Sequence, residues 1–123
     1  MATSFDGDGE MSDLSSTSAA SARGGLSDAP NALRALMKKG LVVAPGAFDA
    51  FSSVLIRDAG FKAIYLGGAW VTASSFGRPD VGWMALPELA DVVRRVVDLS
   101  DLPVIVDADS GYGDLFAIHR TIR

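Results

Sequence analysis

From residue 33 onward, apolar residues recur at helical and strand spacings that alternate along the chain. Leu33, Leu36 and Met37 lie on one face of a helix whose start Ser27 or Asp28 can cap, and helical spacing returns three times further on. Short apolar runs bounded by glycine and proline separate these segments and are typical of buried strands. The pattern predicts helices over 28–39, 49–59, 86–97 and 114–122, and strands over 41–44, 63–66 and 103–106.

The predicted order is a helix followed by three strand–helix units. An irregular stretch is expected over 69–85, where Gly77, Pro79 and Gly82 interrupt regular structure. Helical crossovers between successive strands imply parallel pairing with right-handed connections, so the predicted fold class is α/β. Three units are too few to close a parallel barrel, which needs eight strands and about 250 residues.

Composition excludes several classes of protein. The chain has 123 residues, no cysteine and a net charge of −4. The lack of cysteine excludes a disulfide-stapled domain, a zinc ribbon and a thiol redox centre. No apolar run approaches the ~18 residues of a membrane-spanning helix, and the acidic balance argues against nucleic acid as the main partner.

The acidic charge belongs to the N-terminal part of the chain. Residues 1–30 hold five acidic residues against Arg23, which accounts for the whole net charge of −4. Residues 1–27 are rich in Ser, Ala and Gly and lack periodic apolar residues, so we predict a disordered tail followed by a folded body at 28–123. The tail has neither the apolar core of a secretory signal nor the Arg-rich character of a transit peptide, so we expect a cytoplasmic protein.

Acidic residues follow the predicted third strand, where sites form in parallel α/β proteins. Asp107 and Asp109 are two residues apart, and on an extended segment their side chains point to the same side, about 7 Å apart. Two such carboxylates suit Mg²⁺, although acids at this place also act as turn formers or helix caps. Asp80, in the Gly- and Pro-containing segment 77–82, is either a turn residue or a further site carboxylate.

Four motifs occur in order along the body: residues 45–50 (PGAFDA), residues 59–69 (AGFKAIYLGGA), residues 77–82 (GRPDVG) and residues 102–113 (LPVIVDADSGYG). Together they resemble the isocitrate lyase/phosphoenolpyruvate mutase superfamily, near its 2-methylisocitrate lyase and carboxyphosphonoenolpyruvate mutase-like members. The resemblance runs from Leu33 to Arg123. It implies the first three βα units of a (β/α)₈ TIM barrel.

The resemblance also implies chemistry and partners. It implies a lyase or mutase that uses Mg²⁺, with Mn²⁺ as a substitute, and that cleaves or forms C–C or P–C bonds of small oxo or hydroxy carboxylates through a pyruvate-type enolate. A homo-oligomer, by resemblance a tetramer, is expected for the full-length form. Asp107 is expected to bind the metal, and Asp109 belongs to the metal site and, with Asp80, to the catalytic acids that hold the metal's water shell. The segment expected to bind the substrate carboxylate, largely through backbone N–H groups, is Tyr65, Gly67, Gly68 and Ala69.

The chain departs from the superfamily in two respects. Gly67 stands where Ser or Thr is usual, so a hydroxyl near the substrate is missing. The Lys-Lys-Cys-Gly-type loop of the lyases and a further metal-shell Glu are also missing, so we expect the general acid/base not to lie on this chain. An alternative is therefore a non-catalytic truncated paralogue that associates with a full-length barrel partner. A phosphate or nucleotide site at Gly111-x-Gly113 is disfavoured, because the third Gly and the Lys of a phosphate loop are missing.

Overall fold

The computed structural model describes residues 28–123, so the prediction of a disordered tail over 1–27 falls outside the described residues. No helix formed by residues 28–123 combines the length and the apolar character needed to cross a membrane. The elements, in chain order, are α1 (Ala29–Lys39), β1 (Gly46–Ala47), α2 (Ala50–Asp58), β2 (Ile64–Leu66), α3 (Gly68–Phe76), α4 (Leu86–Ser100), β3 (Val104–Val106) and α5 (Leu115–Ile122).

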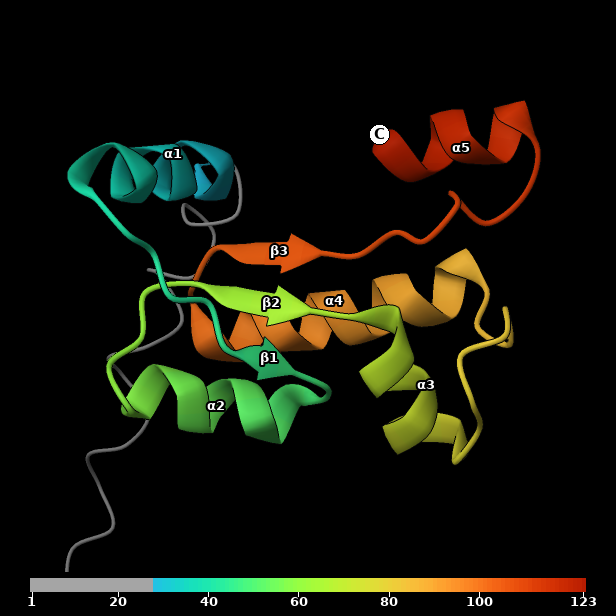
Figure 1. Cartoon of the computed structure of the whole chain (residues 1–123), viewed down its shortest axis with the longest axis horizontal. Coiled ribbons are helices and arrows are strands. Elements are labelled where there is room, and N and C mark those ends of the chain that lie inside the picture. The colour runs from blue at the N-terminus through green and yellow to red at the C-terminus, as the bar shows by residue number, and fades with distance from the viewer. Residues whose placement is uncertain (1–27) are drawn as a thin grey trace, which may run out of the picture.

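The three strands form one parallel sheet in the order β1-β2-β3, as the α/β prediction requires. Gly46, Tyr65 and Ile105 lie in register across the sheet. In Figure 1 the strands point the same way, with α1 near their amino ends and α3 beside their carboxyl ends. Every crossover from one strand to the next contains a helix, so the carboxyl ends of all three strands meet at one edge.

The hydrophobic core lies between one face of the sheet and the helices α2 and α4, which pack against each other. β2 buries Ile64 and Leu66 completely on this face. The opposite face is open, because Tyr65 is 36% exposed and Ile105 is 40% exposed. The prediction of a buried strand over 103–106 is therefore wrong for Ile105, since the elements within residues 28–123 leave that face of the sheet uncovered.

Aspartate caps fix two helix starts that the sequence predicted. Asp49 accepts the backbone N–H of Ser52 at 2.7 Å, and the Ser52 hydroxyl accepts the backbone N–H of Asp49 at 3.2 Å, which forms a capping box at α2. Asp114 accepts the N–H groups of Phe116 and Ala117, both at 3.0 Å, and begins α5. These caps set the direction in which the chain leaves the carboxyl ends of β1 and β3.

The first predicted strand is misplaced. Residues 41–44 form no strand, and β1 lies at Gly46–Ala47 instead. The parallel register sets Pro45 opposite Ile64, the first residue of β2, so residues 41–44 lie beyond the end of the neighbouring strand. Leu41 is accordingly 95% exposed. The apolar run marks an extended approach to the sheet rather than a paired strand.

The stretch predicted to be irregular, 69–85, contains most of α3. The buried residues of this helix are Gly68, Val71 and Thr72, which are spaced as one face of a helix requires. The helix-breaking residues lie after it, and Gly77 ends it in a left-handed conformation with φ of 60°. The prediction gave the breakers too much weight, because they terminate a helix here instead of preventing one.

Candidate functional site

Both carboxylate oxygens of Asp107 are held where the chain leaves β3. Its backbone N–H donates to the carbonyl oxygen of Leu66 at 2.9 Å, which extends the pairing between β2 and β3 by one residue. Its Oδ1 accepts the backbone N–H of Asp109 at 2.9 Å, and its Oδ2 accepts the hydroxyl of Tyr65 at 3.3 Å. Burial and then the Asp107 carboxylate raise the pKa of Tyr65, so this hydroxyl keeps its proton and acts as a donor. Asp107 is thereby oriented while its side chain stays exposed.

Asp109 reaches the same place through a turn. The sequence predicted an extended segment after the third strand, but Asp109 has a left-handed backbone with φ of 46°. Aspartate adopts this conformation more readily than most residues, and the hydrogen bond from its N–H to Asp107 stabilises the turn. The two carboxylates therefore come together for a reason that differs from strand alternation.

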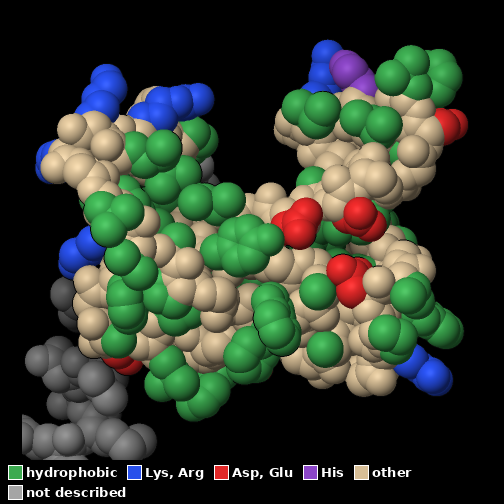
Figure 2. Space-filling view, viewed as in Figure 1, with side chains coloured by type: hydrophobic (Ala, Val, Ile, Leu, Met, Phe, Trp, Pro, Cys, Tyr) green, Lys and Arg blue, Asp and Glu red, His purple; other side chains and the backbone are tan. Residues whose placement is uncertain are grey.

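A cavity of about 40 Å³ at this edge of the sheet brings three acids together, Asp80, Asp107 and Asp109. Asp80 comes from the connection between α3 and α4, whereas the other two follow β3. Acidic side chains gather in one place on the face seen in Figure 2, with hydrophobic side chains around them. The other lining residues are Gly68, Thr72, Gly82, Met84 and Tyr112. Like charges facing one cavity repel each other, so a cation between them lowers the electrostatic energy.

The start of α3 adjoins this cavity. Gly67 is the N-cap and Gly68 and Ala69 open the helix, so their backbone N–H groups have no partner within it. Such a helix end favours a carboxylate or another anion. Gly68 lines the acid cavity, whereas Ala69 is exposed and lies outside its lining. A Cβ at Gly67 would lie 3.1 Å from Cε1 of Tyr65, so a Ser or Thr at this position would press on that ring.

Two hydroxyl-bearing residues of the cavity, Thr72 and Tyr112, were not predicted as site residues from the sequence. Thr72 lay in the stretch predicted to be irregular. The signal that could have found it was the helical spacing of Gly68, Val71 and Thr72. The hydroxyl oxygen of Tyr112 is buried without a hydrogen-bond partner among residues 28–123. Burial raises the pKa of Tyr112, and the carboxylates of Asp109, Asp107 and Asp80 raise it further, in that order. The sequence shows Tyr112 three residues after Asp109, but only the fold places it in the lining of the cavity.

The donor atoms of the cavity fit a hard divalent cation such as Mg²⁺. Its charged lining groups are all carboxylates, the ligands that this cation prefers. Within the described residues, no three His, Cys, Asp or Glu side chains are close enough together to coordinate one ion directly. Mg²⁺ commonly keeps several waters and is bound by one or two carboxylates. The arrangement therefore suits one or two direct carboxylate ligands, with the remaining acid bonded to coordinated water.

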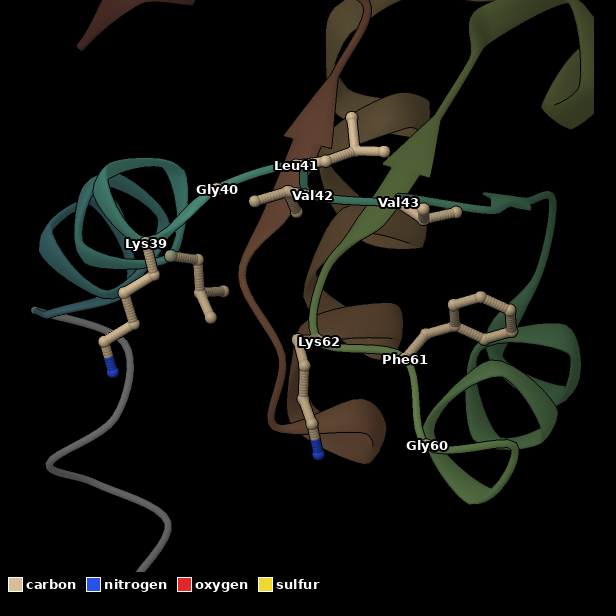
Figure 3. A pocket seen from close by; sticks show the side chains of 9 residues that line it. Lys39, Gly40, Leu41, Val42, Val43, Gly60, Phe61 and Lys62 are labelled. Atoms are coloured by element: carbon tan, nitrogen blue, oxygen red, sulfur yellow. The ribbon is translucent and has the colours of Figure 1, made fainter.

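A second cavity, of about 380 Å³, lies between α1 and the chain segments that lead into β1 and β2 (Figure 3). Its lining is mostly apolar side chains and glycine, and its charged members are Lys39 and Lys62. Both lysine side chains extend away from Val42 and Val43 in Figure 3. No carboxylate lines this cavity, so it shares no chemistry with the acid cavity.

The fold and the acid cavity define a parallel α/β protein with a carboxylate-lined site at the carboxyl ends of its strands. Residues 33–123 match the sequence profile of the family described as phosphoenolpyruvate phosphomutase. The chain is 41% identical over 88 residues to 2,3-dimethylmalate lyase of Eubacterium barkeri, covering 72% of this chain and 30% of that protein. It is 44% identical over 79 residues to 2-methylisocitrate lyase of Bacillus subtilis, covering 64% of this chain and 26% of that protein.

Solved structures show the same similarity. The crystal structure of 2,3-dimethylmalate lyase, a PEP mutase/isocitrate lyase superfamily member, matches with a TM-score of 0.68 at 35% identity over 76% of this chain and 34% of that chain. The structure of phosphonopyruvate hydrolase in complex with oxalate and Mg²⁺ matches with a TM-score of 0.66 at 27% identity, over 75% of this chain and 32% of that chain.

The chain belongs to the phosphoenolpyruvate phosphomutase family, within the PEP mutase/isocitrate lyase superfamily. The resemblance drawn from its four motifs is thereby confirmed, and so is the fold predicted from it, the first part of a TIM barrel with parallel strands. The chain spans between 26% and 30% of the length of the two curated relatives described above.

Proposed function

We propose that this chain forms the metal- and carboxylate-binding part of a Mg²⁺-dependent lyase or mutase that acts like 2-methylisocitrate lyase. Such an enzyme cleaves or forms a C–C or P–C bond of a small oxo or hydroxy carboxylate through a pyruvate-type enolate. The observation that carries the proposal is the convergence of Asp80, Asp107 and Asp109 on one cavity beside the start of α3. A relative named 2-methylisocitrate lyase and the complex of phosphonopyruvate hydrolase with oxalate and Mg²⁺ support it.

The three carboxylates would contact the cation in two ways, directly and through its water. Asp107 and Asp109 would hold it directly, and Asp80 would accept hydrogen bonds from its water. When bound, the cation supplies positive charge that stabilises negative charge developing on a substrate oxygen. Tyr65 keeps the Asp107 carboxylate in position through its 3.3 Å hydrogen bond. Because Asp107 is anchored on both oxygens, it needs little rearrangement to bind a cation.

The substrate carboxylate would bind at the neighbouring helix start. The unpaired N–H groups of Gly67, Gly68 and Ala69 provide donors there, and the positive end of the helix dipole favours an anion. Tyr65 connects the two halves of the site, since its hydroxyl bonds Asp107 and its ring lies beside Gly67.

We assign the general acid/base to a group outside this chain. In this proposal the three carboxylates of the cavity hold the cation and its water, and Tyr65 donates its hydrogen bond to Asp107. The 123-residue chain by itself is therefore expected to show little or no turnover. The test is an assay of the chain with Mg²⁺ and 2-methylisocitrate, isocitrate, oxaloacetate or phosphonopyruvate. Robust turnover of any of them would contradict this assignment.

Cation binding is the direct test of the proposed site. Mn²⁺ is titrated into the full chain while the free ion is followed by electron paramagnetic resonance, with and without oxalate as a mimic of the enolate. We expect saturable Mn²⁺ binding that oxalate tightens and that Asp107→Asn abolishes. Asp98→Asn is the matched control, because Asp98 is an exposed acid of α4 outside the cavity. A wild-type chain that does not bind Mn²⁺ would contradict the proposed function.

A non-catalytic partner of a full-length barrel is the second candidate function. It is favoured by large apolar side chains that are each at least 77% exposed, namely those of Leu41, Leu115, Phe116 and Ile122. Large exposed apolar groups are typical of a surface that another polypeptide covers. Co-purification with a full-length 2-methylisocitrate lyase, without turnover or Mn²⁺ binding by the chain itself, would favour this role over the first.

We further propose that the full-length form is a cytoplasmic, homo-oligomeric enzyme, by resemblance a tetramer. The same exposed apolar side chains support self-association. Light scattering coupled to size-exclusion chromatography measures the mass, and a stable monomer would contradict the oligomer.

A further inference from the structure

Tyr112 is the one lining residue of the acid cavity whose buried polar atom has no partner among residues 28–123. Buried hydroxyl groups in native proteins are almost always hydrogen-bonded, so an unpaired one needs an explanation. Three carboxylates line the same cavity, Asp80, Asp107 and Asp109, but the hydroxyl is hydrogen-bonded to none of them. An additional group between Tyr112 and these acids would give the hydroxyl a hydrogen-bond partner and would also contact the carboxylates.

The fold holds the Tyr112 side chain in this place. Its backbone is left-handed, with φ of 64°, a conformation that a tyrosine rarely adopts. The preceding Gly111 is fixed by two hydrogen bonds: its N–H donates to the carbonyl oxygen of Ala108 at 2.9 Å, and its carbonyl oxygen accepts the hydroxyl of Thr121 at 2.9 Å. The Tyr112 ring also packs against the hydrophobic core. These contacts hold the Tyr112 side chain in the lining of the cavity, with its hydroxyl oxygen buried.

The chemistry of the cavity selects what the hydroxyl can bond. Carboxylates accept hydrogen bonds only, so a water molecule between them donates its protons to them. That water still has lone pairs, which can contact a cation and accept one hydrogen bond. Burial and the surrounding carboxylates raise the pKa of Tyr112, so the phenol stays protonated near neutral pH and can donate that bond. A cavity of about 40 Å³ has room for a cation with part of its water shell.

We propose that Tyr112 is a further residue of the cation site, and that its hydroxyl donates a hydrogen bond to a water of the cation's hydration shell within the cavity lined by Asp80, Asp107 and Asp109. This inference rests on the proposed function, because it needs the cation that the function requires. Tyr112 acts through water and is therefore a positioning residue: it holds the hydration shell in the orientation that the acids require.

The test is Tyr112→Phe in the full chain, which keeps the ring and removes only the hydroxyl. We expect Mn²⁺ affinity to fall about 10-fold, as for other partners that orient metal-bound groups. Thermal unfolding without added metal should be unchanged or occur at a higher temperature, because the variant no longer buries an unpaired hydroxyl. Asp98→Asn serves again as the control and should leave Mn²⁺ affinity unchanged.

A second measurement separates this role from simple packing. The chain has two tyrosines, so ¹³C labelling at the ring carbon that bears the hydroxyl gives two resonances, and Tyr112→Phe identifies the one from Tyr112. We expect that resonance to shift when Mg²⁺ is added to the wild-type chain. If the wild-type chain binds Mn²⁺ and Asp107→Asn abolishes binding, but Tyr112→Phe binds as tightly as wild type and the Tyr112 resonance does not move, only this inference is overturned. If the wild-type chain binds no Mn²⁺, both the inference and the proposed function are overturned.

Discussion

The two cavities lie toward opposite ends of the same short sheet and differ in size and in chemistry. The one at the amino ends measures about 380 Å³ and is lined mainly by apolar groups, with Lys39 and Lys62 extending away from Val42 and Val43. The one at the carboxyl ends measures only about 40 Å³, yet it gathers three carboxylates, a tyrosine hydroxyl and the start of a helix. The comparison teaches that donor chemistry, and not volume, distinguishes the end of the sheet at which we propose the site.

The direction of the strands explains the difference. At the carboxyl ends the chain leaves the sheet into turns and helix starts, which bring unpaired N–H groups and aspartates to one edge. At the amino ends the chain arrives from helix ends and extended segments, which carry apolar residues such as Leu41 and Phe61. Parallel α/β folds therefore concentrate polar chemistry at one edge, and changes at the two ends should have different consequences.

The largest effect is expected from Asp107→Asn, which removes a charge from the acid cavity while keeping the side-chain shape. Mn²⁺ affinity should fall by about 100-fold or more, because changes to outer partners alone commonly cost 10- to 100-fold. The folded chain should persist, since the Asn oxygen can still accept the backbone N–H of Asp109 and its NH₂ group can donate to the hydroxyl oxygen of Tyr65. Isothermal titration with Mn²⁺ measures the change, and a fall of less than threefold would remove Asp107 from the metal site.

The next largest effect is expected from Gly111→Ala. Gly111 has φ of +94°, and an added Cβ would lie 2.6 Å from Cγ1 of Ile118, so the substitution combines backbone strain with overpacking. The free energy of unfolding should fall by about 2 kcal/mol and Mn²⁺ affinity should fall with it.

Gly60→Ala is the matched control at the other cavity. Gly60 has φ of +87° but has open space around its Cβ position, so backbone strain alone acts there. Its cost should be about 1 kcal/mol, with no effect on Mn²⁺ binding. Urea unfolding measures both variants, and equal losses would show that the contact with Ile118 contributes nothing.

A smaller effect concerns pH. The folded state raises the pKa of Tyr112 above its ordinary value of 10.0, so it retains the phenol proton more tightly than the unfolded chain does. The stabilisation is complete below pH 10 and is lost as the pH rises through the folded-state pKa. Urea unfolding between pH 8 and 11 should therefore show a steeper loss of stability for wild type than for Tyr112→Phe. Identical slopes would mean that the phenol does not titrate differently in the two states.

The smallest effect is expected from Lys39→Ala combined with Lys62→Ala. These residues belong to the lining of the larger cavity and lie outside that of the acid cavity. Mn²⁺ affinity should stay within about twofold of wild type, because exposed charges beyond a Debye length are largely screened at physiological salt. A tenfold change would show that the two ends of the sheet are coupled.

The sequence by itself determined the features that depend on neighbouring residues. Asp49 and Asp114 cap the helices that local spacing placed after them. The strands at 63–66 and 103–106 were predicted within one residue of β2 and β3, since both are bounded by residues that interrupt strands. The motifs around Asp80 and Asp107 could also be recognised from the sequence, because a family resemblance depends on residue identity and order.

Only the tertiary structure decided how distant segments meet. The register between β1 and β2 leaves residues 41–44 unpaired, although their apolar pattern is typical of a strand. Asp109 reaches the cavity by a left-handed turn, and Tyr112 lines the same cavity as Asp80, which comes from a segment far away in the chain. The physical reason is that backbone pairing and side-chain packing between remote elements outweigh local preference by more than the ~1 kcal/mol that such preferences contribute.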